Sequence, residues 1–208
     1  MPGRTRIALY GGTFDPVHLG HLEVARSVSE LFEIEKVVFI PAQVAPHKVG
    51  RPVTAPLHRY AMLALATEDD PRLLISTFEL DAPDRRYTVD TVAEFQRRLG
   101  DDTELFFVMG ADSWSEITTW REWERLLKMT NHIVVTRPGY EVAPAPAGLG
   151  ERIFFTDAVL KDISATSIRR LASEGHYDEL QQLVPQSVAD YIKKYEIYRN
   201  TNEAKLNS

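Results

Sequence analysis

Two histidines, His18 and His21, stand in a glycine-rich stretch, residues 11–21, that reads GGTFDPVHLGH. An apolar run precedes the stretch and a segment with helical spacing follows it, which predicts a strand, a turn and a helix. Histidines three residues apart can project to one side of a first helical turn and donate hydrogen bonds to phosphate oxygens. Gly11 and Gly12 let the backbone approach such a ligand closely. Since a helix start also favours an anion, the stretch predicts an anion site.

Other interpretations of residues 11–21 fit less well. The two histidines lack the H-x-x-x-H spacing and the third ligand that a zinc site needs. No Gly-Lys-Ser/Thr follows, so the stretch is not a Walker A loop, and it does not match the dinucleotide fingerprint G-x-G-x-x-G. For any single residue, a glycine turn with solvated histidines is the alternative. The whole string, between a strand and a helix, favours a ligand site.

A second polar stretch, residues 163–170, reads ISATSIRR and opens another predicted helix. Ser164 or Thr166 could cap that helix, which is a common structural role. The same hydroxyls and free N–H groups, with Arg169 one turn later, would also make a second anion cradle.

Two charged residues follow predicted strands. Lys48, in the loop sequence PHK, is either a point charge for a phosphate or a solvated surface lysine. Asp112, in the sequence GADS that starts at Gly110, could accept hydrogen bonds from ribose hydroxyls, help to hold a cation, or cap a helix.

Three tryptophans, Trp114, Trp120 and Trp123, fall close together on a helix-like segment. Indoles so placed usually pack in the core, whereas one exposed at a strand end would stack on a heteroaromatic ring. Periodicity does not distinguish between the three.

The elements that must position these residues alternate between strand and helix. The predicted strands are residues 6–10, 36–41, 73–80, 104–109, 132–136 and 152–156. The predicted helices are residues 19–32, 55–67 with Thr54 as N-cap, 88–99, 113–128 with a break near 118–119, and two or three pieces from about 166. Alternation with near-continuous apolar strands predicts an α/β fold: a Rossmann-like, doubly wound parallel sheet with helices on both faces and a small helical C-terminal part. Ligands bind beyond the carboxyl ends of such strands.

Length and composition limit the possible classes of protein. The 208 residues predict one domain, residues 1–208, with a surface loop at 138–150 and a frayed tail at 200–208. The absence of cysteine excludes disulfides, thiolate zinc sites, iron–sulfur clusters and cysteine nucleophiles. The net charge of −6 argues against a nucleic-acid partner. With no long apolar run and no signal peptide, we expect a cytoplasmic protein without a membrane partner.

The motifs resemble a known family. GGTFDPVHLGH resembles the GGTFDPxHxGH signature of the T/HxGH nucleotidyltransferases, and ISATSIRR resembles their ISSTxIR motif. PHK, RYTVDTV, GADSW…TTW and RPGY resemble segments of the bacterial nicotinate-nucleotide adenylyltransferases, and the matches run from about residue 7 to 198. The resemblance implies a single nucleotidyltransferase domain. It also implies adenylyl transfer from ATP, with Mg²⁺, to nicotinate mononucleotide, in NAD biosynthesis, by direct in-line attack without a covalent enzyme intermediate.

The resemblance also implies roles for particular residues, and it assigns no residue as a metal ligand. The catalytic residues would be His18, His21, Lys48 and Arg169. The ATP-binding residues would be Gly11, Gly12, Thr13, Phe14, Ser164, Thr166 and Ile168. The mononucleotide-binding residues would be Thr88, Gly110, Asp112, Trp120, Arg121 and Arg137.

Two positions depart from the family pattern. Ala165 stands where a serine is common, and Arg121 stands where an aromatic residue is frequent. Three other functions stay open at this point: the same chemistry on nicotinamide mononucleotide or another phosphate ester, a nucleotide-binding regulatory module without turnover, and a class I aminoacyl-tRNA synthetase. The last has a HIGH-like string, but this chain lacks the length and the basic surface that a tRNA partner requires.

Overall fold

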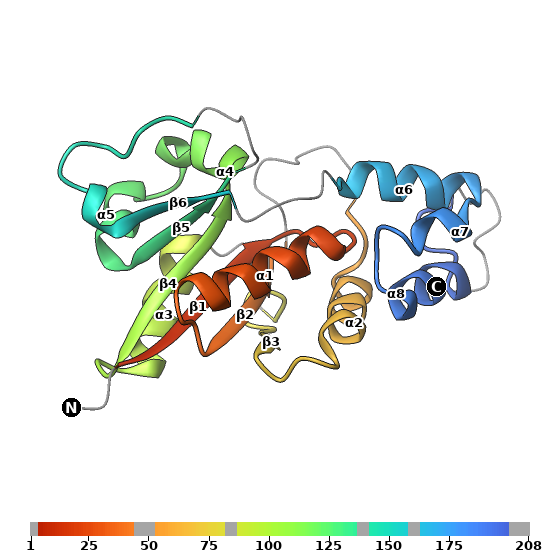
Figure 1. Ribbon diagram of the computed structural model, residues 1–208, viewed down its shortest axis with the longest axis horizontal. Helices are drawn as coiled ribbons and strands as arrows, with labels where there is room; N and C mark the ends of the chain where they lie inside the picture. The colour runs from red at the N-terminus through yellow and green to blue at the C-terminus, as the bar shows by residue number, and fades with distance from the viewer. Residues whose placement is uncertain (1–3, 44–52, 82–86, 137–141, 158–162, 200–208) are drawn as a thin grey trace.

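The computed structural model describes residues 4–43, 53–81, 87–136, 142–157 and 163–199. Within them, six parallel strands form one sheet in the order β3-β2-β1-β4-β5-β6 (Figure 1). The strands are β1 (Thr5–Gly12), β2 (Lys36–Pro41), β3 (Leu73–Ile75), β4 (Thr103–Gly110), β5 (Asn131–Val135) and β6 (Ile153–Thr156). This order confirms the predicted doubly wound sheet, and the winding direction reverses between β1 and β4.

The helices cover both faces of the sheet. They are α1 (Leu19–Leu31), α2 (Pro56–Thr67), α3 (Thr88–Leu99), α4 (Ala111–Ser115), α5 (Trp123–Met129), α6 (Ala165–Glu174), α7 (Tyr177–Leu180) and α8 (Gln186–Lys194). Side chains alternate along each strand, so Ala8 packs with α1, α2 and the C-terminal helices, and Leu9 packs with α3 and α5. The predicted helical C-terminal part is α6, α7 and α8, which gather beside α2 at one end of the molecule (Figure 1).

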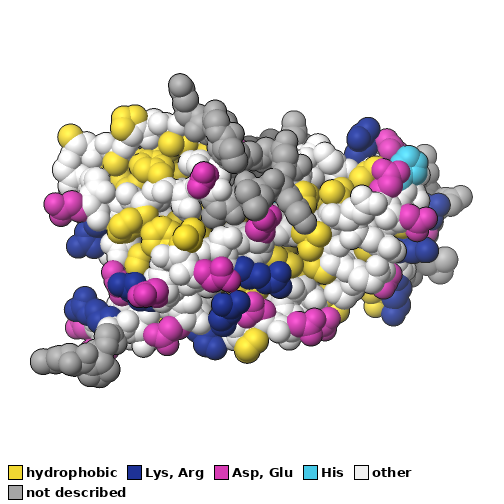
Figure 2. Space-filling model, viewed as in Figure 1, with side chains coloured by type: hydrophobic (Ala, Val, Ile, Leu, Met, Phe, Trp, Pro, Cys, Tyr) yellow, Lys and Arg dark blue, Asp and Glu magenta, His cyan; other side chains and the backbone are white. Residues whose placement is uncertain are grey.

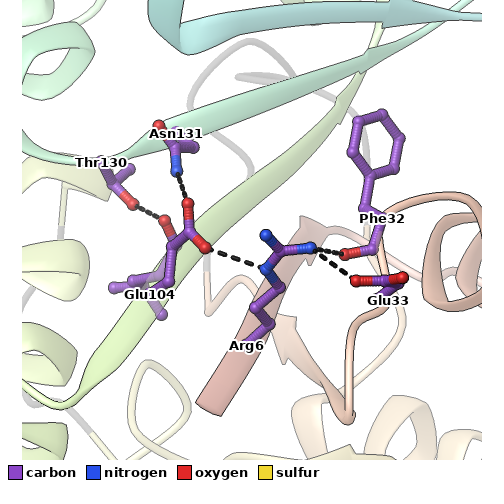
Figure 3. A network of polar contacts seen from close by, with 7 residues as sticks. Arg6, Phe32, Glu33, Glu104, Thr130 and Asn131 are labelled. Carbon is purple, nitrogen blue, oxygen red and sulfur yellow. Dashed lines mark hydrogen bonds and ion pairs between the residues drawn. The ribbon is translucent and has the colours of Figure 1, made fainter. Parts of the chain in front are cut away.

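A polar network joins three strands near their amino ends (Figure 3). The Glu104 carboxylate accepts a hydrogen bond from Arg6 Nε at 2.9 Å and another from Asn131 Nδ2 at 3.0 Å. Arg6 Nη1 also donates to the Phe32 carbonyl at 3.1 Å and to Glu33 at 3.2 Å, beyond the end of α1. The network ties β1, β4 and β5 together at the edge opposite the one where ligands bind in such sheets.

Two local predictions need correction, and a third is confirmed. Ala55, not Thr54, is the N-cap of α2, because the Thr54 backbone is bonded elsewhere. The strand predicted over residues 73–80 ends at Ile75, because the Ser76 hydroxyl accepts from the Phe78 N–H and makes a local turn. The predicted helix 113–128 is two helices, α4 and α5, separated by a 3₁₀ turn at Ile117–Thr119, and this turn confirms the predicted break.

Some predictions fall on residues that lie outside the described ranges. These are Lys48, Arg137, the tail 200–208, and most of the loop 42–52. Of the predicted loop 138–150, the described residues 142–149 contain neither helix nor strand, as expected.

On the face drawn in Figure 2, acidic and basic residues are interspersed. Among the described helices, none combines the length and the apolar character needed to cross a membrane.

Candidate active site

A cavity of about 440 Å³ opens at the carboxyl edge of the sheet, where the order reverses between β1 and β4. Its walls come from four parts of the chain: the end of β1 with the start of α1, residues 110–112 after β4, residues 135–136 after β5, and residues 163–169 at the start of α6. The volume is within the range of small-molecule sites. The cavity therefore lies where doubly wound sheets bind their ligands.

Packing of aromatic rings explains the two glycines at the end of β1. A Cβ atom at Gly11 would lie 2.9 Å from the Phe107 ring, and one at Gly12 would lie 2.7 Å from the Phe14 ring. The Phe14 ring is buried against Phe39, 5.3 Å between centroids, and the Phe14 backbone has a φ of 49°, in the left-handed region. The glycines thus make room for core rings, and the cavity is lined by Tyr10, Thr13 and Phe14 rather than by the glycines between them.

The two histidines meet at the start of α1. Their rings stack with centroids 3.7 Å apart and planes 28° apart, and both rings line the cavity. The His18 backbone N–H donates to His21 Nδ1 at 3.2 Å. An accepting Nδ1 requires the His21 proton on Nε2, so Nε2 carries the N–H of this ring.

Arg169 connects the second polar stretch with the first. Ser164 caps α6, as predicted, and its hydroxyl accepts from the Ser167 N–H at 3.2 Å. One turn later, Arg169 Nη1 donates to the Asp15 carbonyl at 2.8 Å, and Nη2 donates to Thr166 Oγ1 at 3.1 Å. Two helix starts, each suited to an anion, therefore face one cavity.

Asp15 is buried and connects distant parts of the chain through hydrogen bonds, and the sequence analysis gave it no role. Its carboxylate accepts from the Tyr198 hydroxyl at 2.7 Å and from the Thr54 N–H at 3.2 Å. Burial, and then the negative charge of Asp15, raise the pKa of Tyr198 far above its usual value, so the phenol stays protonated and donates. The segment after α8 is thereby fixed to the loop that carries the histidines.

Arg59 is a second residue that the sequence analysis missed. Its side chain is fully buried, and it donates to the carbonyls of Thr13 at 2.8 Å, Thr54 at 3.0 Å and Gln43 at 3.3 Å. Burial lowers the pKa of the guanidinium, and the charge of Asp15 opposes that effect. A signal was present in the sequence, because Arg59 falls on the apolar face that α2 makes with Met62, Leu63 and Ala66.

The structure brings together most of the predicted phosphate-binding residues. Those that line the cavity are Thr13, Phe14, His18, His21, Ser164, Thr166 and Arg169. Gly110 and Asp112 line it too, from the end of β4. Ala165 is also part of the wall and has no hydroxyl to offer. The Ile168 side chain is fully buried in the core, which leaves its backbone for any contact with a ligand.

Three predicted mononucleotide residues lie outside this cavity, beside the core on the other face of the sheet. Thr88 is the first residue of α3, directly after Tyr87. The Arg121 guanidinium lies over the Tyr87 ring, 4.7 Å from its centroid. Trp120 packs edge-on against Phe107, and its buried Nε1 has no hydrogen-bond partner among the described residues. The structure thus gathers Thr88, Trp120 and Arg121 into a separate cluster.

The other two tryptophans pack in the core, as indoles in a helix-like segment usually do. Trp114 is buried, and its Nε1 donates to the Ala143 carbonyl at 2.8 Å. Trp123, the first residue of α5, is partly buried and packs against the same core.

The geometry agrees with the comparisons to known proteins. The cytidylyltransferase-like family model matches residues 9–171. Proteins named probable nicotinate-nucleotide adenylyltransferase are 40% identical in Thermoanaerobacter sp. (98% of this chain, 99% of that protein) and 43% identical in Thermus thermophilus (93% and 100%).

The fold has a counterpart among solved structures. The Plasmodium falciparum nicotinic acid mononucleotide adenylyltransferase complexed with NaAD superposes with a TM-score of 0.77 at 20% identity, over 93% of this chain and 97% of that one. This likeness concerns the fold, and the relatives at 40% identity or more define the family. The chain belongs to the cytidylyltransferase-like family and, within it, to the nicotinate-nucleotide adenylyltransferases.

Proposed function

We propose that this chain transfers the adenylyl group of ATP to nicotinate mononucleotide, producing nicotinate adenine dinucleotide and pyrophosphate in NAD biosynthesis. The observation that carries the proposal is the meeting of His18, His21 and Arg169 around one cavity between β1 and β4. Their N–H donors match the phosphate oxygens of a nucleoside triphosphate. The names of the relatives support the choice of the acceptor.

In the proposed reaction, an oxygen of the mononucleotide phosphate attacks the α-phosphorus of ATP. A new oxygen–phosphorus bond forms as the bond from the α-phosphorus to the bridging oxygen breaks, and that oxygen leaves with pyrophosphate. No covalent enzyme intermediate is needed. Catalysis then rests on positioning of the two substrates and on stabilisation of charge.

The residues around the cavity would stabilise the phosphates in different ways. The His21 Nε2–H and the His18 imidazole would donate to the phosphate oxygens as negative charge moves toward the leaving pyrophosphate. Arg169, held by Asp15 and Thr166, would supply a fixed positive charge at the start of α6.

The backbone of Thr13 and Phe14 and the start of α6 would hold ATP. Lys48, from the loop after β2, would contribute a further positive charge to the phosphates.

Mg²⁺ would enter with ATP. Within the described ranges, no group of three or more His, Asp or Glu side chains is placed to hold a metal ion. Of the carboxylates in the cavity wall, Asp15 is bonded to Tyr198 and Thr54, whereas Asp112 is exposed. Asp112 and the ATP phosphates therefore fit Mg²⁺, which usually binds to one or two carboxylates plus substrate phosphates and neutralises their charge.

The cluster of Thr88, Trp120 and Arg121 would receive the pyridine ring and its carboxylate. The Thr88 N–H at the start of α3 and the Arg121 guanidinium are donors that fit a carboxylate, and the Trp120 indole offers a stacking surface. Gly110 and Asp112 would contact the ribose between this cluster and the cavity. Arg137 would contact the mononucleotide from the segment after β5.

The test is replacement of one imidazole with its backbone left in place. We expect His18→Ala to lower kcat by about 100-fold or more, with a much smaller change in KM for ATP, because the contact strengthens in the transition state. His176→Ala, which removes an exposed histidine next to α7, is the matched control. Turnover close to wild type in His18→Ala would contradict the proposed role of the histidines in catalysis.

A further inference from the structure

Arg59 donates to three backbone carbonyls from three parts of the chain, and one of these residues, Thr13, lines the proposed nucleotide site. Thr13 follows β1, Gln43 follows β2, and Thr54 precedes α2. We propose that Arg59 is a positioning residue: by holding the Thr13 carbonyl inward, it turns the Phe14 N–H toward the phosphates of ATP. This inference rests on the proposed function, since it assumes that the cavity binds a nucleoside triphosphate.

The peptide geometry gives the reason. In a trans peptide the C=O and the N–H point in opposite directions, so a Thr13 carbonyl bonded to Arg59 sends the Phe14 N–H away from Arg59. Thr13 and Phe14 both line the cavity. If this peptide were reversed, the partial negative charge of a carbonyl oxygen would face the phosphates. Arg59 thus withdraws an acceptor from the anion site and leaves a donor there.

The loop needs such support because Phe14 holds an unusual backbone conformation. Its φ of 49° is in the left-handed region, which non-glycine residues keep only where their surroundings fix them. The neighbours on both sides are held: Thr13 by Arg59, and Asp15 by Arg169 and Tyr198. The conformation of the donor-bearing peptide is thus set by contacts from α2, α6 and the segment after α8.

The presence of an arginine at position 59 points to a role in positioning backbone carbonyls rather than in packing the core. Burying a positive charge is costly, and well-packed apolar residues often stabilise a core equally well. The neighbours of Arg59 on the same face of α2, Met62 and Leu63, are apolar and fully buried. A guanidinium presents donors in a fixed fork that can reach several carbonyls at once, whereas a lysine is a single mobile point charge.

The experiment measures ligand binding without any acceptor. We expect Arg59→Lys and Arg59→Met to weaken ATP binding about tenfold or more by calorimetric titration, with adenosine binding unchanged within about twofold, since adenosine has no phosphates. The control is Arg97→Met, which removes an exposed arginine of α3 bonded to Glu94, and it should bind ATP as the wild type does.

The outcomes separate this inference from the proposed function. If wild type binds no ATP, the proposed function fails. If wild type binds ATP and the Arg59 variants bind it equally well, or lose ATP and adenosine to the same extent, the positioning role is overturned.

A measurement on the wild-type protein covers the case in which the Arg59 variants do not fold. Labelling threonine carbonyls with ¹³C and phenylalanine nitrogens with ¹⁵N selects two amides, Phe14 and Phe78, because only these phenylalanines follow a threonine. Thr77→Ser removes the Phe78 signal and so identifies Phe14. We expect the Phe14 amide resonance to move when inorganic pyrophosphate or ATP is added. A Phe14 resonance that stays in place with bound ATP would overturn the inference.

Discussion

The Arg169 guanidinium donates to the backbone carbonyl of Asp15, 154 positions earlier in the chain, at 2.8 Å. This contact joins the start of α6 to the loop that leads into His18 and His21 at the start of α1. The two polar stretches, residues 11–21 and 163–170, therefore line a single cavity, and the arginine proposed to meet the phosphates is held by the loop itself. Because the guanidinium is oriented before the substrate arrives, its charge is preorganised.

Arg169→Lys should show that orientation matters as well as charge. A lysine keeps the positive charge but cannot bond the Asp15 carbonyl and Thr166 in the same fork geometry. We expect kcat/KM to fall about 10- to 100-fold in steady-state assays of pyrophosphate release. Arg170→Lys, at an exposed neighbouring position, should keep wild-type kinetics. Equal kinetics in the two variants would contradict the role of the fork.

Tyr198→Phe tests the junction at Asp15. The change leaves a buried carboxylate without one of its donors, which should lower the free energy of unfolding by about 1–3 kcal/mol in urea titrations. Tyr195→Phe, at a more exposed position on the same segment, should change it by less than about 0.5 kcal/mol. A Tyr198→Phe protein as stable as wild type would mean that the hydroxyl contributes nothing to the junction.

Acid should destabilise the protein through His132, which is fully buried in β5 and bonds the Leu126 carbonyl. Burial lowers its pKa from 6.5 to about 4. As the pH falls below about 6.5, the unfolded chain binds a proton that the folded chain refuses until about pH 4. The free energy of unfolding should therefore drop by about 3 kcal/mol as the pH falls from about 6.5 to about 4. Above about pH 6.5, the neutral His132 should no longer make stability depend on pH.

His132→Gln removes that titration, so the variant should lose stability less steeply than wild type between pH 6.5 and pH 4. His176→Gln, at an exposed site, should keep the wild-type slope. Unfolding in urea at a series of pH values measures both. Parallel curves for wild type and His132→Gln would show that the buried imidazole is not the source.

The sequence predicted the layers well, because hydrophobic periodicity is a local property. Apart from β3, the strand ends, α1 and α3 lie within a few residues of their predicted bounds, and Ser164 caps α6 as expected. The strand predicted over 73–80 failed beyond Ile75, because a serine turn competes there with a short edge strand.

The residues that hold the site together were harder to foresee. Tyr198 meets Asp15 across 183 positions, and no local pattern encodes such a contact. The sequence shows Arg59 as a charged residue on the apolar face of α2. Its three carbonyl partners are known only once the loops after β1 and β2 are placed. Motifs therefore identified the residues that would touch ATP, and only the fold showed what positions them.

The most direct test of the account is pyrophosphate release from ATP and Mg²⁺ with nicotinate mononucleotide in one sample and nicotinamide mononucleotide in the other. We predict rapid release with the acid and at least about tenfold lower kcat/KM with the amide, since the amide leaves the donors of Thr88 and Arg121 without a carboxylate. Chromatography should identify nicotinate adenine dinucleotide in an amount equal to the pyrophosphate. No release with either acceptor would contradict the proposed reaction.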